Sequence, residues 1–135
     1  MSEPAYVAEN QLHNAAANGH EDVVSALIDA GAKVNEVDKL GRTPLYWASL
    51  NGHESLVSAL IAAGADVNKA NRHGKTPLYW ASLKGHESVA SVLIAAGADV
   101  NKADEYGWPP LLVALVLAPF LIRRDTIATL SYSEA

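Results

Sequence analysis

The sequence predicts an all-α repeat solenoid, in which short helix–turn–helix units stack along one axis. When residues 40–72 are aligned with residues 73–105, 25 of the 33 positions are identical. A fixed period of this length is typical of repeat architectures. So short a unit cannot bury its own apolar face, and neighbouring units must therefore stack on it. We expect about three full units and an irregular one at the C-terminal end.

The composition indicates one folded domain and excludes several classes of site. Of the 135 residues, 50% are hydrophobic and 19% are charged, as in a globular protein. The net charge of -5 argues against nucleic-acid binding, because a phosphate-binding surface needs clustered basic residues. No cysteine is present, which excludes disulfides and thiolate zinc sites. The first residues lack the features of a signal peptide, so we expect an intracellular, cytoplasmic protein.

Each central unit contains signals for two helices. Thr43 and Pro44 predict an N-cap hydroxyl followed by proline at the first helical position. Gly52 can adopt the left-handed conformation that ends this first helix. A second helix is predicted over about residues 54–62, where apolar side chains recur at helical spacing. An extended loop follows over residues 65–74, with a turn at its end.

Three short motifs recur in the two central units. Gly-Arg-Thr-Pro-Leu-Tyr-Trp-Ala at 41–48 returns at 74–81 with a single change, from Arg to Lys. Gly-His-Glu follows in both units, and each unit closes on Gly-Ala-Asp-Val-Asn. Together these motifs closely resemble the ankyrin repeat. The resemblance covers about residues 9–118 and departs from the family at Tyr46 and Tyr79, where the family usually has His.

The resemblance implies a single domain of four units, with residues 9–39, 40–72, 73–105 and 106–135. The first unit has an altered opening, and its polar residues suit a cap at the end of a stack. The residues that replace Thr, Pro, Leu and Tyr there are Asn10, Gln11, Leu12 and His13. In the last unit, Pro110 still marks an opening, but the apolar run that follows it breaks the pattern.

No group of residues predicts catalysis, a cofactor site or a metal site. The sequence contains no phosphate-binding loop, nucleophile elbow or His-Glu-x-x-His pattern. Three histidines recur at the same position of successive units, at His20, His53 and His86. The resemblance implies that each hydrogen-bonds a neighbouring loop instead of a metal. The recurring carboxylates are explained as turn residues, at Asp66, Asp99 and Asp104.

The resemblance implies a protein-binding function, through a concave groove formed by the first helices and the loop tips. Trp47 and Trp80 hold equivalent positions, which in ankyrin-like stacks face the groove and not the core; the alternative is that they only pack on neighbouring helices. Trp, Tyr and Arg dominate binding hot spots. The predicted protein-binding residues are Leu40, Arg42, Trp47, His73, Lys75, Trp80, Tyr106 and Trp108.

The apolar segment at residues 111–122 leaves other functions open. It completes the core, mediates self-association as a homo-oligomer, or contacts a membrane. Its short length and Pro119 argue against the membrane. The alternative function is therefore a structural or self-associating scaffold. Two nearly identical units also fit an engineered or recently duplicated array without a natural partner.

Three asparagines end equivalent loop motifs, at Asn35, Asn68 and Asn101. In the ankyrin family, such residues resemble substrates of asparaginyl hydroxylases. The alternative is that each side chain only holds its loop turn.

Overall fold

The helices of the chain are short and are arranged in pairs. A computed structural model describes residues 11–110. Its first helix covers residues 11–17. The helices that follow are α2 (Glu21–Asp29), α3 (Pro44–Leu50), α4 (Glu54–Ala62), α5 (Pro77–Lys84) and α6 (Glu87–Ala95). No residue in this described range lies in a strand.

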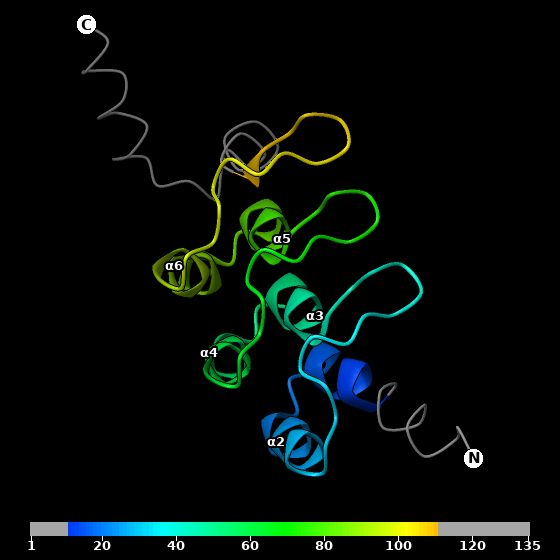
Figure 1. The fold of residues 1–135 in the computed structure, drawn as a ribbon. Coiled ribbons are helices and arrows are strands. Elements are labelled where there is room, and N and C mark those ends of the chain that lie inside the picture. Colours follow the sequence, from blue (N-terminus) through cyan, green and yellow to red (C-terminus); the bar gives the residue numbers. More distant parts are fainter. Residues whose placement is uncertain (1–10, 111–135) are drawn as a thin grey trace, which may run out of the picture.

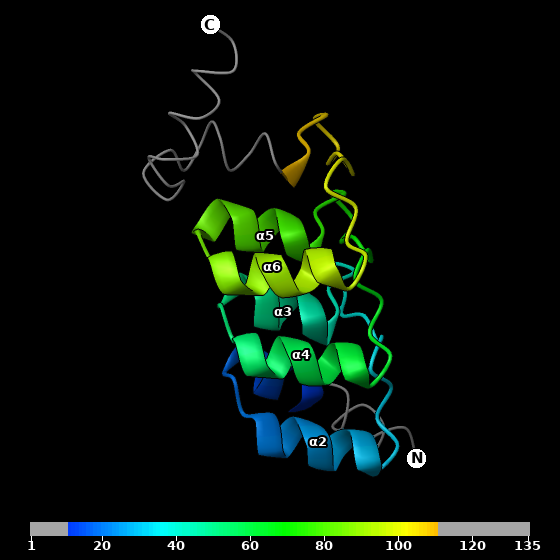
Figure 2. The same ribbon diagram turned by 90° about the vertical axis from the view of Figure 1, so that its left-hand side faces the viewer.

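The helix pairs stack in register. Figure 1 shows α2, α4 and α6 in one column, with the helix over residues 11–17, α3 and α5 in the next. Long loops project from the second column on the side away from the first. After a turn of 90° about the vertical axis, the same helices are seen as parallel layers (Figure 2). This arrangement confirms the predicted all-α repeat solenoid.

The helix starts follow the predicted chemistry. The Thr43 hydroxyl accepts a hydrogen bond from the Tyr46 backbone N–H at 3.1 Å, and Thr76 accepts an equivalent bond from Tyr79 at 3.1 Å. Both threonines are buried and are followed by proline. A buried hydroxyl in this position satisfies a backbone donor that the helix itself leaves free. Gly52 has a φ of 76°, which is the left-handed conformation expected after the first helix.

Leucines from both columns meet to form the core. Leu45 of α3 and Leu60 of α4 are fully buried, and Leu93 of α6 is equally enclosed in the next layer. Burial of each such side chain contributes about 1.5–3 kcal/mol. Ala48 and Ala81 are also fully buried. Their small size lets α3 and α5 pack closely, so that consecutive units share one continuous core.

The first unit opens differently from the predicted polar cap. Asn10 lies outside the described residues, and Gln11 is exposed. His13 is buried, with its Nε2 at 2.9 Å from the carbonyl oxygen of Glu36 and at 3.1 Å from that of Arg42. The ring therefore ties the first helix to the following loop, because the loop carbonyls need a donor once water is excluded.

Histidine rings join each unit to the preceding one. His53 Nε2 donates to the Ala17 carbonyl at 3.0 Å, and His86 Nε2 donates to the Leu50 carbonyl at 3.0 Å. Both acceptors are the last residues of helices, where carbonyl groups lack intrahelical partners. The contact thus falls on a helix end and not on the loop that the resemblance implies. His20 is exposed, and its ring makes no hydrogen bond with the described residues.

Three loop hairpins share one turn geometry, at residues 38–42, 71–75 and 104–108. In the first, the Asp38 N–H donates to the Arg42 carbonyl at 3.0 Å. Asp38 Oδ1 also accepts from the backbone N–H groups of Leu40 and Arg42, each at 3.0 Å. Asn71 and Asp104 repeat this pattern in the later hairpins. One short polar side chain therefore closes each turn.

Hydrogen bonds also link each loop to the next. At the hairpin tips, the Arg72 N–H donates to the Leu40 carbonyl at 3.0 Å. At the loop bases, Asn35 Nδ2 donates to the Gly64 carbonyl at 3.1 Å, while Asn35 Oδ1 accepts from the Asp66 N–H at 2.7 Å. Equivalent bonds connect the second and third loops. The loops therefore form one cross-linked edge of the solenoid, in which the side-chain amides of Asn35 and Asn68 each hold the following loop.

Candidate functional site

The first hairpin holds two of the predicted binding residues against each other. Arg42 Nε lies 2.7 Å from Asp38 Oδ2, and the guanidinium carbon lies 4.4 Å from the centre of the Trp47 ring. Trp47 Nε1 donates to the same Asp38 oxygen at 3.4 Å. Burial alone would raise the pKa of Asp38, but hydrogen bonds from the backbone and guanidinium of Arg42 and from the Leu40 N–H hold it below its usual value.

Trp47 is therefore a structural residue as well as a surface one. Its ring is partly buried and packs against the hydrophobic core. Arg42 covers one face of the ring, in a cation–π contact that stabilises by about 0.5–2 kcal/mol. The prediction that this position does not face the core is thus wrong, because the indole packs against it.

Four aromatic side chains form a row along α3 and α5. We call this set the aromatic row; it consists of Tyr46, Trp47, Tyr79 and Trp80. The ring centres of Tyr46 and Trp47 are 5.9 Å apart, those of Tyr46 and Trp80 are 6.1 Å apart, and those of Trp80 and Tyr79 are 5.4 Å apart. All three contacts are edge-to-face. Each such pair adds about 0.5–1.5 kcal/mol beyond the area that it buries. The row therefore joins two consecutive units through their first helices.

Tyr46 contacts both tryptophans of the aromatic row. Its hydroxyl accepts a hydrogen bond from Asn71 Nδ2 at 3.3 Å. The Trp80 indole N–H faces the same hydroxyl but lies outside hydrogen-bond geometry. Burial raises the pKa of Tyr46, and these polar neighbours offset only part of the rise. A tyrosine in place of the family's usual histidine thus still reaches the following hairpin.

The second and third hairpins meet through charge and aromatic contacts. Lys75 Nζ lies 5.5 Å from the centre of the Tyr79 ring and 5.7 Å from that of Tyr106, with Asp104 Oδ2 at 4.0 Å. His73 Nδ1 lies 3.1 Å from Glu105 Oε1. Burial raises the pKa of Tyr79, and the Asp104 carboxylate raises it further. Lys75 is therefore held mainly by intramolecular partners.

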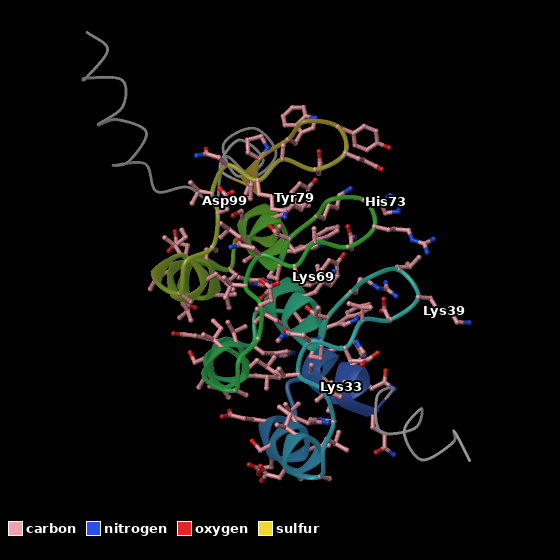
Figure 3. All side chains as sticks on the ribbon, in the orientation of Figure 1. Lys33, Lys39, Lys69, His73, Tyr79 and Asp99 are labelled. Carbon is pink, nitrogen blue, oxygen red and sulfur yellow. The ribbon has the colours of Figure 1, made fainter. Side chains whose placement is uncertain are left out.

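The eight predicted residues fall into two groups on the hairpin side of the solenoid. Arg42, Lys75 and the two tryptophans are held by the contacts above. Three of the others are exposed, namely His73, Tyr106 at 74% and Trp108 at 37%. Figure 3 shows His73 at the tip of its hairpin, and Leu40 at the equivalent position is partly exposed. The accessible group therefore lies along the hairpin tips.

Several residues of this surface were not predicted. Asp38 and Asn71 close the turns that present the tips, and their equivalent places in successive units could have revealed them. Lys39 and Arg72 are exposed at equivalent tip positions. The repeats differ at this position as well, because Arg72 aligns with Glu105, so the same comparison of units could have found both residues.

Other predicted features lie outside this surface. Within residues 11–110, no three His, Cys, Asp or Glu side chains gather where they could hold a metal ion. The helices of that range are all too short or too polar to cross a membrane. The apolar segment at residues 111–122 and most of the fourth unit lie outside the described residues, so self-association stays a prediction.

Comparison with known proteins identifies the family. The family model described as ankyrin repeats, in three copies, matches residues 12–104. No curated protein matches the chain significantly. The matched range is shorter than the predicted 9–118, and it covers most of the chain and all five labelled helices. The chain therefore belongs to the ankyrin-repeat family, whose members are generally non-enzymatic protein–protein interaction modules.

Proposed function

We propose that the chain binds a partner protein through the hairpin tips and the neighbouring edge of the aromatic row. The observation that carries this proposal is the placement of Tyr106, Trp108, His73 and Leu40 along one edge, with large exposed aromatic area at its end. Tyrosine and tryptophan bury much area on binding and lose little conformational freedom.

The rigidity of this edge supports the proposal. Each hairpin is closed by four hydrogen bonds, two from its backbone and two to one side chain, as in the turn of Asp38. Backbone bonds then connect the tips, from Arg72 to Leu40 and from Glu105 to His73. A surface that is already ordered loses little entropy when a partner docks, so more of the contact energy appears as affinity.

Substitution of the exposed tip residues tests the proposal. The variant Leu40→Ala/His73→Ala/Tyr106→Ala removes tip side chains that make few core contacts. Val23→Ala/Ile94→Ala is the control, since both residues are exposed apolar side chains on α2 and α6. Proteins retained by the wild-type chain from native lysate are identified, and their affinities are then measured by titration.

We expect the tip variant to lose at least about 30-fold in affinity, as for a hot-spot residue worth about 2 kcal/mol. The control should bind like the wild type. Retained binding by the tip variant, with loss in the control, would contradict the proposal. The Trp47→Ala/Trp80→Ala variant tests the aromatic row separately: a lower melting temperature with unchanged partner binding would assign these two residues to packing alone.

A further inference from the structure

The charge of the hairpin tips changes sign along the solenoid. Lys39, Arg72 and Glu105 occupy the same position in three consecutive hairpins, and all three are exposed. The tips therefore carry two successive positive charges followed by a negative one. The helix pairs do not impose this order, because the side chains at these positions lie outside the core.

The two positive charges are not neutralised by the described part of the chain. Arg72 Nη2 donates to the Lys39 carbonyl at 2.8 Å, which holds its guanidinium over the first tip. Neither Arg72 nor Lys39 makes an ion pair with any residue in the range 11–110. Arg42 and Lys75, by contrast, each face an aspartate. Most N–H groups of the Arg72 guanidinium therefore remain available to a carboxylate.

The third tip has a different chemistry. Its carboxylate, Glu105, is paired with His73 at 3.1 Å. The side chains that follow it are Tyr106 and Trp108, both exposed. A nucleic acid or an anionic membrane presents negative charge throughout, so it would gain at the first two tips and be repelled at the third. A polypeptide segment can match both parts, because its side chains change from residue to residue.

We infer that the hairpin tips select an extended partner segment with acidic residues at one end and apolar or aromatic residues at the other. The acidic end lies over Lys39 and Arg72, and the apolar end lies against Tyr106 and Trp108. Packed helices are about 8–10 Å apart, so the tips recur at about that distance. An extended chain covers it in about three residues. This inference rests on the proposed function and adds the chemistry and direction of the ligand.

Peptide selection tests the inference with the full chain. The probe is a displayed library of random peptides of about 12 residues, which span roughly 40 Å when extended. Selection is repeated on Lys39→Glu/Arg72→Glu. The matched control is Lys84→Glu/Lys102→Glu, in which two exposed lysines away from the tips undergo the same change of charge. Arg72→Lys keeps the charge of the tip and removes the planar group. Melting temperatures show that each variant is folded.

We expect wild-type and control selections to be enriched in Asp and Glu at one end, and the Lys39→Glu/Arg72→Glu selection to favour Lys and Arg instead. A selected acidic peptide should bind this variant about tenfold more weakly at low salt, since two exposed ion pairs are lost and each is worth up to about fivefold. Arg72→Lys should bind the peptide within about threefold of the wild type. The loss of affinity in Lys39→Glu/Arg72→Glu should vanish in about 1 M NaCl, where the screening length is about 3 Å.

The outcomes separate the inference from the proposed function. Peptides that bind the tips but are neutral or basic, or that are equally selected by the charge-reversed variant, would overturn the inference alone. Peptides that bind elsewhere, insensitive to the Leu40→Ala/His73→Ala/Tyr106→Ala variant, would overturn both. Duplex DNA or phosphatidylserine vesicles that bind through Lys39 and Arg72, with no acidic peptide selected, would replace the polypeptide ligand with another polyanion.

Discussion

Replacing His86 with alanine should weaken the contact between the second and third units. The His86 ring donates to the Leu50 carbonyl at the end of α3 and lies directly against Gly52. A Cβ added to Gly52 would come within 2.7 Å of this ring, so glycine leaves the space that the ring fills. His86→Ala therefore removes a donor from a helix end and opens a gap beside Gly52.

The size of the effect follows from these two losses. A hydrogen bond contributes about 0.5–1.5 kcal/mol, and a carbonyl left without a donor away from water costs about 1–3 kcal/mol. The Leu50 carbonyl lies at a partly buried helix end, where water can replace some of the lost bond. We therefore expect the free energy of unfolding to fall by about 2 kcal/mol, in the middle of the range for a carbonyl left without a donor.

His20 provides a matched control. It precedes α2 with backbone angles of -82° and 79°, close to the -83° and 77° of His86 before α6. Any effect on helix initiation is therefore the same in both variants. The His20 ring has no hydrogen-bond partner among the described residues, so His20→Ala should cost less than about 0.5 kcal/mol. Urea unfolding followed by circular dichroism measures both, and equal losses would refute the assigned role of the ring.

Three further predictions concern glycine geometry, tyrosine ionisation and assembly. Gly52→Ala should destabilise by at least about 1 kcal/mol more than Gly64→Ala, because both have positive φ but only Gly52 faces a ring; the excess should disappear in a His86→Ala background, and its persistence would rule out the clash. Because the pKa of Tyr46 is raised in the folded chain, its neutral side chain stabilises the fold below about pH 10, and this stability is lost at higher pH, where the unfolded chain deprotonates first. Tyr46→Phe should therefore reduce the fall in the denaturation midpoint between about pH 10 and 12. An unchanged slope in the variant would refute this. Self-association through residues 111–122 predicts sedimentation coefficients that rise with concentration, and a strictly monomeric profile would exclude it.

The sequence was sufficient to predict the repeating part of the fold, because the same local signals return with each period. The start of α3 at Thr43 and Pro44 could be predicted locally, since the cap depends only on the neighbouring backbone. The predicted span of residues 54–62 coincides with α4. The opening of the first unit was less predictable, because the burial of His13 depends on the carbonyls of Glu36 and Arg42, which lie far along the chain.

The contacts of the candidate site were harder to predict than its position. The variable positions 42 and 75 do lie in the hairpins, but Arg42 and Lys75 turn back onto aromatic rings and aspartates. For Lys75 that choice depends on the distance to the next hairpin, which carries Asp104 and Tyr106 and which the sequence does not specify. Trp47 likewise packs on the core as well as facing the hairpin. For exposed residues such as Tyr106, the protein-binding role stays a prediction.

The bonds between units have a mechanical consequence. Each unit is joined to its neighbour by the shared core and by hydrogen bonds, such as the histidine contact with Leu50 and the paired amide bonds of Asn68. A pulling force applied to the two ends of the chain loads these links in series. Once one set gives way, its unit is released, which adds roughly 110 Å of extended chain. We therefore expect the two central units, which have 33 residues each, to lengthen the chain in equal steps, and a partner that spans several hairpins would oppose their separation.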